Sequence, residues 1–154
     1  MAVMLVTKKL GLIRVFAITV CVSLLVGCNP DRVQVDTETS RFLSIFDCPV
    51  ASGTYESVEI AELIANPAIF DGKAVEISGY HISSFEHSAI YPTPQDTFSA
   101  NFSEGIWTLI STERNVGNKD RVTLRGVYTT KIRGHGSQWP GSMCVHSIVP
   151  RIEA

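Results

Sequence analysis

A chain of 154 residues is long enough for a single domain of ordinary size. Its 13 Lys and Arg against 15 Asp and Glu give a formal net charge of −2, which argues against a nucleic-acid binder, because such proteins usually carry a basic patch or stripe. The one loose basic cluster is better explained as the solvated edge of a strand, where charges discourage aggregation. It comprises Lys119, Arg121, Arg125, Lys131 and Arg133.

The N-terminal segment has the pattern of an export signal. Three basic residues precede an uncharged apolar run over residues 15–26, which is shorter than the about 20 residues that a membrane-spanning helix needs. The run ends in Leu25-Val26-Gly27-Cys28, which resembles the lipobox of bacterial lipoproteins, with cleavage after Gly27 and lipid attachment to Cys28. We therefore expect residues 1–27 to be a signal peptide. A plain membrane anchor or a buried helix is the alternative.

The lipobox resemblance implies an anchored protein outside the cytoplasm. Acyl chains on Cys28 would hold the mature chain to a bilayer durably, since each buried methylene contributes about 0.8 kcal/mol. Asn29 follows Cys28, which by resemblance to lipoprotein sorting in Gram-negative bacteria implies the outer membrane, facing the periplasm. Loss of the leader leaves ten Lys and Arg against fifteen Asp and Glu, so the mature chain has a net charge of −5.

The mature chain begins with a polar segment and contains two further cysteines. We expect residues 28–41 to be the lipidated cysteine and a flexible tether, and residues 42–154 to be the folded domain. Cys48 and Cys144 would meet an oxidising compartment, which favours a disulfide between them. Two separate buried thiols are the alternative, because free cysteine packs as a small apolar group.

Residues 57–81 predict a short helix, a turn and a strand. Apolar residues at the three-and-four spacing indicate an amphipathic helix, capped by Ser57 and ended by Pro67. Asp71-Gly72 supplies turn chemistry. Residues 73–80 alternate apolar and polar side chains, which is the period of a half-buried strand.

Four more strands are predicted, and together the five suggest a barrel. They cover residues 85–91, 106–110, 121–130 and 142–149, with loops over residues 95–105, 114–120 and 134–141. Gly79 and Gly126 lie inside strands, where glycine often marks the bend of a tight barrel. We therefore expect a mainly β fold, a small five-stranded OB-like barrel preceded by one short helix. A β-sandwich is the alternative, but it needs about seven strands.

Several stretches resemble a group of small uncharacterised bacterial proteins with an OB-like barrel, and also the periplasmic bacterial OB-fold proteins. The resemblance implies the fold and supplies no catalytic residues. The chain departs from the pattern in its lipobox, its two cysteines and the loop over residues 137–140. The matching stretches are Ile60-Ala61-Glu62-Leu63-Ile64-Ala65-Asn66-Pro67, Phe70-Asp71-Gly72-Lys73, Val75, Gly79-Tyr80, Phe85-Glu86, Ile90-Tyr91, residues 122–127 and Gly134-His135.

No set of residues has the spacing of a catalytic or metal site. His81, Glu86 and His87 fall close together, but a metal needs three or four converging ligands, and adjacent strand residues point to opposite faces. The glycine-rich stretch Gly134-His135-Gly136-Ser137 lacks the lysine of a phosphate loop. We expect no metal, no cofactor and no catalytic residues. A metal-dependent or hydrolytic envelope enzyme is the alternative.

Aromatic residues indicate a ligand surface better than the titratable residues do. Most rings are expected in the core, because a small barrel must fill its interior with bulky side chains. Trp139 lies in a loop with Gly and Pro, so we expect it, with His135 and Tyr91, at any ligand surface. OB barrels bind oligonucleotides or oligosaccharides on one face and its flanking loops. We therefore predict a non-catalytic binding or interaction module whose partner is an envelope protein or glycan. An oligonucleotide-binding domain is the alternative, which charge and location disfavour.

Overall fold

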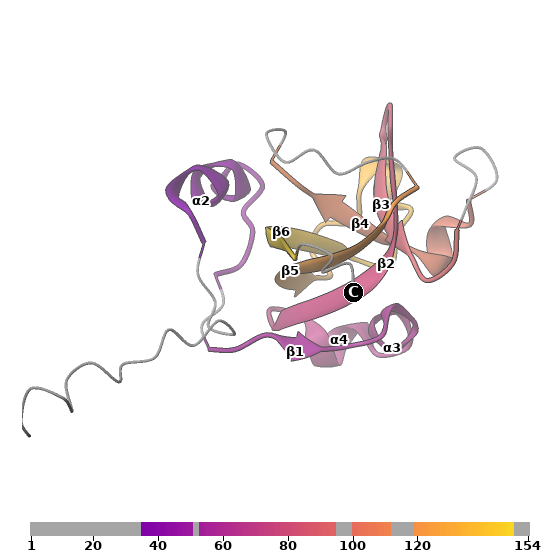
Figure 1. Ribbon diagram of the computed structural model, residues 1–154, viewed down its shortest axis with the longest axis horizontal. Helices are drawn as coiled ribbons and strands as arrows, with labels where there is room; N and C mark the ends of the chain where they lie inside the picture. Colours follow the sequence, from indigo (N-terminus) through magenta and orange to yellow (C-terminus); the bar gives the residue numbers. More distant parts are fainter. Residues whose placement is uncertain (1–34, 51–52, 95–99, 112–118, 150–154) are drawn as a thin grey trace, which may run out of the picture. The chain divides into compact units, whose positions relative to one another are not determined.

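Five strands form a closed barrel, to which a short strand is added at one edge (Figure 1). The computed structural model describes residues 35–50, 53–94, 100–111 and 119–149. The barrel strands are β2 (Ala74–Ser84), β3 (His87–Tyr91), β4 (Ile106–Leu109), β5 (Arg121–Thr129) and β6 (Ser142–Val149), and the added strand is β1 (Glu56–Ser57). The helices are α2 (Thr37–Ser44), α3 (Ile60–Ala65) and α4 (Pro67–Phe70), with 3-10 turns η1 (Phe102–Glu104) and η2 (His135–Ser137).

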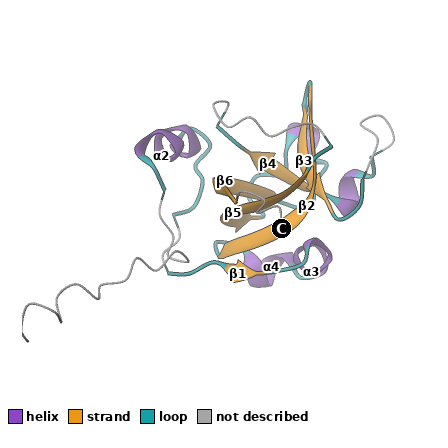
Figure 2. Ribbon diagram, viewed as in Figure 1, coloured by secondary structure: helices purple, strands orange, loops and turns teal. Residues whose placement is uncertain are grey.

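The sheet closes because its two outer barrel strands pair with each other. Neighbours follow the order β2-β3-β4-β6-β5, and β5 pairs back with β2 (Figure 2). The barrel pairs are antiparallel except for β4 with β6, which run parallel. This mainly β, mixed barrel confirms the predicted OB-like fold. The sandwich alternative is wrong, because it requires two sheets packed face to face and these strands belong to one closed sheet.

The alternation predicted for β2 places its apolar side chains inside the barrel. Val75 and Ile77 are buried, whereas Glu76 is partly exposed and Ser78 is exposed. Helices α3 and α4 add their own apolar side chains to this core. The fully or nearly buried members of the core are Val58, Ile60, Leu63, Phe70, Val75, Ile77, Ile90, Ile106, Leu124, Tyr128, Met143 and Val145.

Two short helices replace the single helix expected before the barrel. Pro67 ends α3 as predicted, with Asn66 at φ −132° and ψ 50° between the two helices. Pro67 also begins α4, because the first helical position needs no backbone N–H donor. The prediction that Ser57 caps the helix is wrong. Ser57 lies in β1, and Glu59, with extended backbone, precedes α3 without a side-chain hydrogen bond to it.

The bend predicted at Gly126 coincides with a β-bulge. Strand β6 carries one extra residue, His146, between its pairs with Arg125 and Gly126. The two strands come so close at this point that a Cβ on Gly126 would overlap the carbonyl oxygen of Cys144. A side chain is therefore excluded from this position.

Helix α2 occupies the last part of the segment expected to be a flexible tether, residues 28–41. Asp36 is its N-cap, and the carboxylate accepts a hydrogen bond from the backbone N–H of Thr39 at 2.8 Å, which satisfies a donor that the helix leaves unpaired. Residues 37–41 of the expected tether are therefore helical, and its role as a tether stays a prediction. Residues 28–34 of that segment lie outside the described residues.

The predicted disulfide between Cys48 and Cys144 is present and attaches the segment after α2 to β6. The sulfur atoms are 2.04 Å apart and the two Cα atoms 6.1 Å apart. Beside the bridge, Leu43 of α2 packs with Leu109 and Val127 in a small cluster outside the main core. The alternative of two separate thiols is wrong.

Replacing both cysteines with alanine should lower the free energy of unfolding by about 2–5 kcal/mol, because the bridge closes a loop with a sequence separation of 96. Urea-induced unfolding of the double variant and of the wild type measures the difference. Wild-type protein unfolded in the presence of a reductant is the matched control and should resemble the double variant. Coincident unfolding midpoints for all three samples would contradict this prediction.

Candidate functional site

Two connections between barrel strands line one hollow of about 460 Å³. One is the turn between β2 and β3, and the other is the loop between β5 and β6. The turn η1, which precedes β4, contributes a third wall through an aromatic ring. The residues that line the hollow are Ser84, Phe85, Glu86, His87, Phe102, His135, Gln138 and Trp139.

The β2–β3 turn consists of two residues, Phe85 and Glu86. They join Ser84 to His87, which pair with each other across the hairpin. A strand was expected from Phe85 onward, but it begins at His87, because Glu86 has a positive φ of 55° that no strand residue adopts. The Phe85 side chain is 90 % exposed. The turn therefore places an apolar ring and a carboxylate at the rim of the hollow.

Glycines allow the β5–β6 loop to fold back onto the barrel. Gly134 and Gly136 have positive φ angles of 68° and 64°. A Cβ on Gly134 would lie 2.7 Å from ring atoms of both Trp107 and Trp139, so a larger residue does not fit there. The guanidinium of Arg133 donates a hydrogen bond to the carbonyl oxygen of Trp139 at 2.8 Å, which closes the loop.

The two connections contact each other at the rim through His135 and Glu86. The Nε2 atom of His135 lies 3.4 Å from a carboxylate oxygen of Glu86, and both side chains are about half exposed. An exposed contact of this kind contributes little to stability. The contact matters for the site because it places an imidazole and a carboxylate, both able to form hydrogen bonds, on the same side of the hollow.

Trp139, which its loop position set apart from the core aromatic residues, is nevertheless buried. Its side chain is only 1 % exposed, although its surface still lines the hollow together with that of His135. Three rings bury it, with centroids 4.6 Å away at Phe102, 4.7 Å at Trp107 and 5.4 Å at His87. Trp139 is therefore the floor of the hollow.

Tyr91 lies beneath the hollow rather than on its wall. The residue is fully buried, and its hydroxyl is 3.0 Å from Nε2 of His87. Burial raises the pKa of the Tyr91 phenol, so it stays protonated and can donate to His87. Of the three residues expected at a ligand surface, His135 and Trp139 thus share one hollow and Tyr91 supports it. A ligand role for them stays a prediction.

A third histidine, His81, makes separate polar contacts within the barrel wall. Its Nε2 atom lies 3.1 Å from the hydroxyl of Thr108, which in turn is 2.8 Å from the hydroxyl of Ser88. Its Nδ1 atom has no hydrogen-bond partner among the described residues. Burial, and to a lesser degree the nearby His87, lowers the pKa of His81 to about 4, and burial also lowers the pKa of His87.

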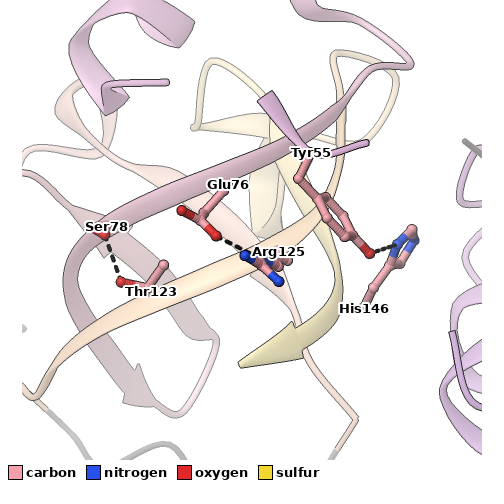
Figure 3. A network of polar contacts seen from close by, with 6 residues as sticks. All are labelled: Tyr55, Glu76, Ser78, Thr123, Arg125 and His146. Carbon is pink, nitrogen blue, oxygen red and sulfur yellow. Dashed lines mark hydrogen bonds and ion pairs between the residues drawn. The ribbon is translucent and has the colours of Figure 1, made fainter. Parts of the chain in front are cut away.

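A row of polar side chains crosses the outside of the barrel (Figure 3). The guanidinium of Arg125 donates to Glu76 at 2.6 Å and lies over the ring of Tyr55, with 5.5 Å from its central carbon to the ring centroid. The hydroxyl of Tyr55 is 3.2 Å from Nδ1 of His146. Arg125, expected at a solvated edge, is thus half buried in an ion pair. These contacts hold the segment before β1 against β5 and β6.

Within the described residues, no three His, Cys, Asp or Glu side chains are grouped closely enough to hold a metal ion. Neither is any described helix long and apolar enough to cross a membrane. The side chains that line the hollow offer aromatic rings, two imidazoles, a carboxylate, a hydroxyl and an amide.

Six of the eight residues that line the hollow were not expected at a ligand surface, namely Ser84, Phe85, Glu86, His87, Phe102 and Gln138. Phe102 and Gln138 stand in loops without any periodic pattern, and His87 looked like an ordinary strand histidine. The signal that could have indicated them is their position beside the two connections that OB barrels use for ligands.

Comparison of the chain with models of protein families, with curated proteins and with solved structures gave no match.

Replacing His81 with glutamine should make the protein less sensitive to acid. In the unfolded chain His81 gains a proton below about pH 6.5, whereas in the fold it does so only near its pKa of about 4, so stability is lost as the pH falls between these values. The loss at pH 4 is on the order of 3 kcal/mol for this residue. Glutamine keeps a polar group near Thr108 and does not titrate.

Urea-induced unfolding at pH 7.5 and at pH 4.5 measures the effect for both proteins. Carboxylates contribute equally to the pH dependence of both proteins. The difference between the wild type and the variant in the unfolding free energy lost from pH 7.5 to pH 4.5 therefore isolates His81. Equal losses in the wild type and the variant would contradict the prediction.

Proposed function

We propose that this protein is a lipid-anchored lipoprotein of the bacterial cell envelope, located in the outer membrane and facing the periplasm, whose OB-like barrel is a non-catalytic module that binds an envelope glycan. The observation that carries the proposal is the hollow between the β2–β3 turn and the β5–β6 loop, with its aromatic walls and polar rim.

The lining of the hollow suits a sugar chain. Binding sites for small organic groups are mostly apolar with a few polar groups that fix orientation. The rings of Phe85 and Phe102 offer flat apolar surface for the C–H faces of a pyranose. Gln138, His135 and Glu86 lie at the same hollow and can hydrogen-bond to hydroxyl and amide groups.

The charge around the hollow disfavours the oligonucleotide alternative. Binding to phosphate backbones depends on Lys and Arg, and none of the described residues that line the hollow is basic other than the two histidines. Glu86 adds a negative charge at the rim, and the mature chain is acidic as a whole. A neutral or weakly charged ligand meets no such repulsion.

Two features support the envelope location. The lipobox-like Leu25-Val26-Gly27-Cys28 follows a basic and apolar leader. The disulfide between Cys48 and Cys144 is of the kind that forms and persists in oxidising compartments such as the periplasm.

Substitutions at the rim should weaken glycan binding without unfolding the barrel. Phe85→Ser and His135→Ala should each lower the affinity for soluble glycan fragments of the envelope by about tenfold, the effect of losing roughly 1.4 kcal/mol of contact. Isothermal titration calorimetry measures the affinities. Trp139 is a poorer choice, because it is buried and its removal would also destabilise the fold.

Ile69→Ser is the matched control, because Ile69 is an exposed apolar residue of α4 that does not line the hollow. It should bind like the wild type. Equal affinity in all four proteins, or binding of single-stranded oligothymidine in place of the glycan fragments, would contradict the proposed ligand.

The anchor is tested separately by metabolic labelling with palmitate in a Gram-negative host. The wild-type chain should incorporate the label and fractionate with outer membranes, because Cys28 carries the acyl chains. Cys28→Ser should lose both the label and the membrane association. A wild-type chain that begins at Met1 and carries no label would overturn the lipoprotein assignment.

A further inference from the structure

Exposed apolar side chains gather on the short segment that follows α2. Ile45 is 74 % exposed, Phe46 40 % and Val50 98 %. Elsewhere among the described residues, the exposed large apolar side chains are those of Ile69 and Phe85, which lie apart in the sequence. We refer to Ile45, Phe46 and Val50 as the α2 edge.

The α2 edge projects from a fixed base. Leu43 is buried against the outside of the barrel, and Cys48 is bonded to Cys144 of β6. The ring of Phe46 packs on that of Phe42, with centroids 5.2 Å apart. The chain is therefore held to the barrel just before the edge, at Leu43, and within it, at Cys48, and the apolar side chains of the edge are still exposed to solvent at a cost in free energy.

A shallow apolar hollow of about 270 Å³ adjoins the edge. Leu43, Cys48, Pro49 and Val50 line it, with His146 of β6 at one side. More of its exposed lining is apolar than polar. Val50 belongs to both the edge and this hollow, whose lining also includes Ser40 and Ser44 of α2. Exposed apolar surface of this kind marks sites of contact with a partner or a membrane.

We infer that the α2 edge lies in the boundary between headgroups and acyl chains of the membrane that carries the lipid anchor. The inference rests on the proposed lipidation of Cys28. The α2 edge would then be a second contact with the bilayer, in addition to the lipid anchor. This contact would orient the barrel with its α2 side toward the membrane.

The short chain between the proposed lipid anchor and α2 keeps the α2 edge close to the bilayer. Thr37, the first residue of α2, follows Cys28 by nine positions, and a chain of that length extends to about 30 Å at most. Tethering over so short a span raises the effective concentration of the edge at the bilayer to the millimolar range. A few apolar side chains with weak affinity of their own therefore suffice for a lasting contact, and a soluble partner has no comparable advantage.

The charges of the segment indicate which lipids it contacts. Asp36, Glu38 and Asp47 are exposed near the edge, and Arg41 is the exposed basic residue of α2. This acidic excess would be repelled by a strongly anionic surface, where basic side chains are favoured. The edge accordingly suits zwitterionic headgroups such as phosphatidylethanolamine and phosphatidylcholine.

Tryptophan placed on the edge reports its depth. The full chain with Phe46→Trp is expressed with its leader, purified in detergent and reconstituted into phosphatidylcholine vesicles with or without brominated acyl chains, which quench nearby indoles. Most of the emission that the introduced indole adds over the wild type should be lost in the brominated vesicles. Phe85→Trp, on the β2–β3 turn that Figure 1 shows well apart from α2, is the matched control and should keep its added emission.

Flotation of the same vesicles separates the two proposals. A chain that does not float has no anchor, and the lipoprotein assignment and the membrane contact both fail. A chain that floats but whose Phe46→Trp emission is as insensitive to bromine as that of Phe85→Trp is anchored without the contact, and only the present inference fails. Emission of the Phe46→Trp variant that changes with protein concentration instead would identify a second copy as the occupant and would also overturn it.

Discussion

The closure of the barrel depends on one strand, β2, which pairs with two other barrel strands along different parts of its length. Residues Ala74 to Tyr80 pair with β5, and residues Tyr80 to Ser84 pair with β3, so β2 passes from one neighbour to the other near its middle. Gly79 lies at this passage, where a Cβ would overlap the carbonyl oxygen of Tyr91 and crowd Ile60. Without that close approach the strand could not bend between its partners, and the sheet would stay open with two unpaired edges.

Closure also explains why the candidate site lies where it does. The β2–β3 turn and the β5–β6 loop are far apart in the chain, and they share one hollow because the barrel brings their strands around to each other. Trp107 links this site to helix α2. It packs with the outer cluster around Leu43 and also contacts Trp139 with a centroid separation of 4.7 Å. The floor of the hollow therefore rests on a side chain that α2 helps to cover.

Features governed by local chemistry could be predicted from the sequence, and features governed by distant contacts could not. The alternation of β2, the bounds of β6 and the bend at Gly126 each follow from a short pattern. The pairing of Cys48 with Cys144 followed from compartment and from the small number of cysteines. The burial of Trp139 was missed, because the three rings that cover it come from three separate segments. Helix α2 was missed because a polar stretch with one good N-cap has no apolar period to reveal it.

The disulfide decides how the molecule bears mechanical load. Any pull on the chain from its N-terminal side first straightens α2 and then reaches Cys48, where the covalent bridge passes the force directly to Cys144. The load thus enters β6, which is hydrogen-bonded to β4 on one side and β5 on the other, and bypasses the segment between the two cysteines. Unravelling that starts before Cys48 therefore stops at Cys48, and the barrel, with the hollow in it, stays intact when force is applied to the chain from that side.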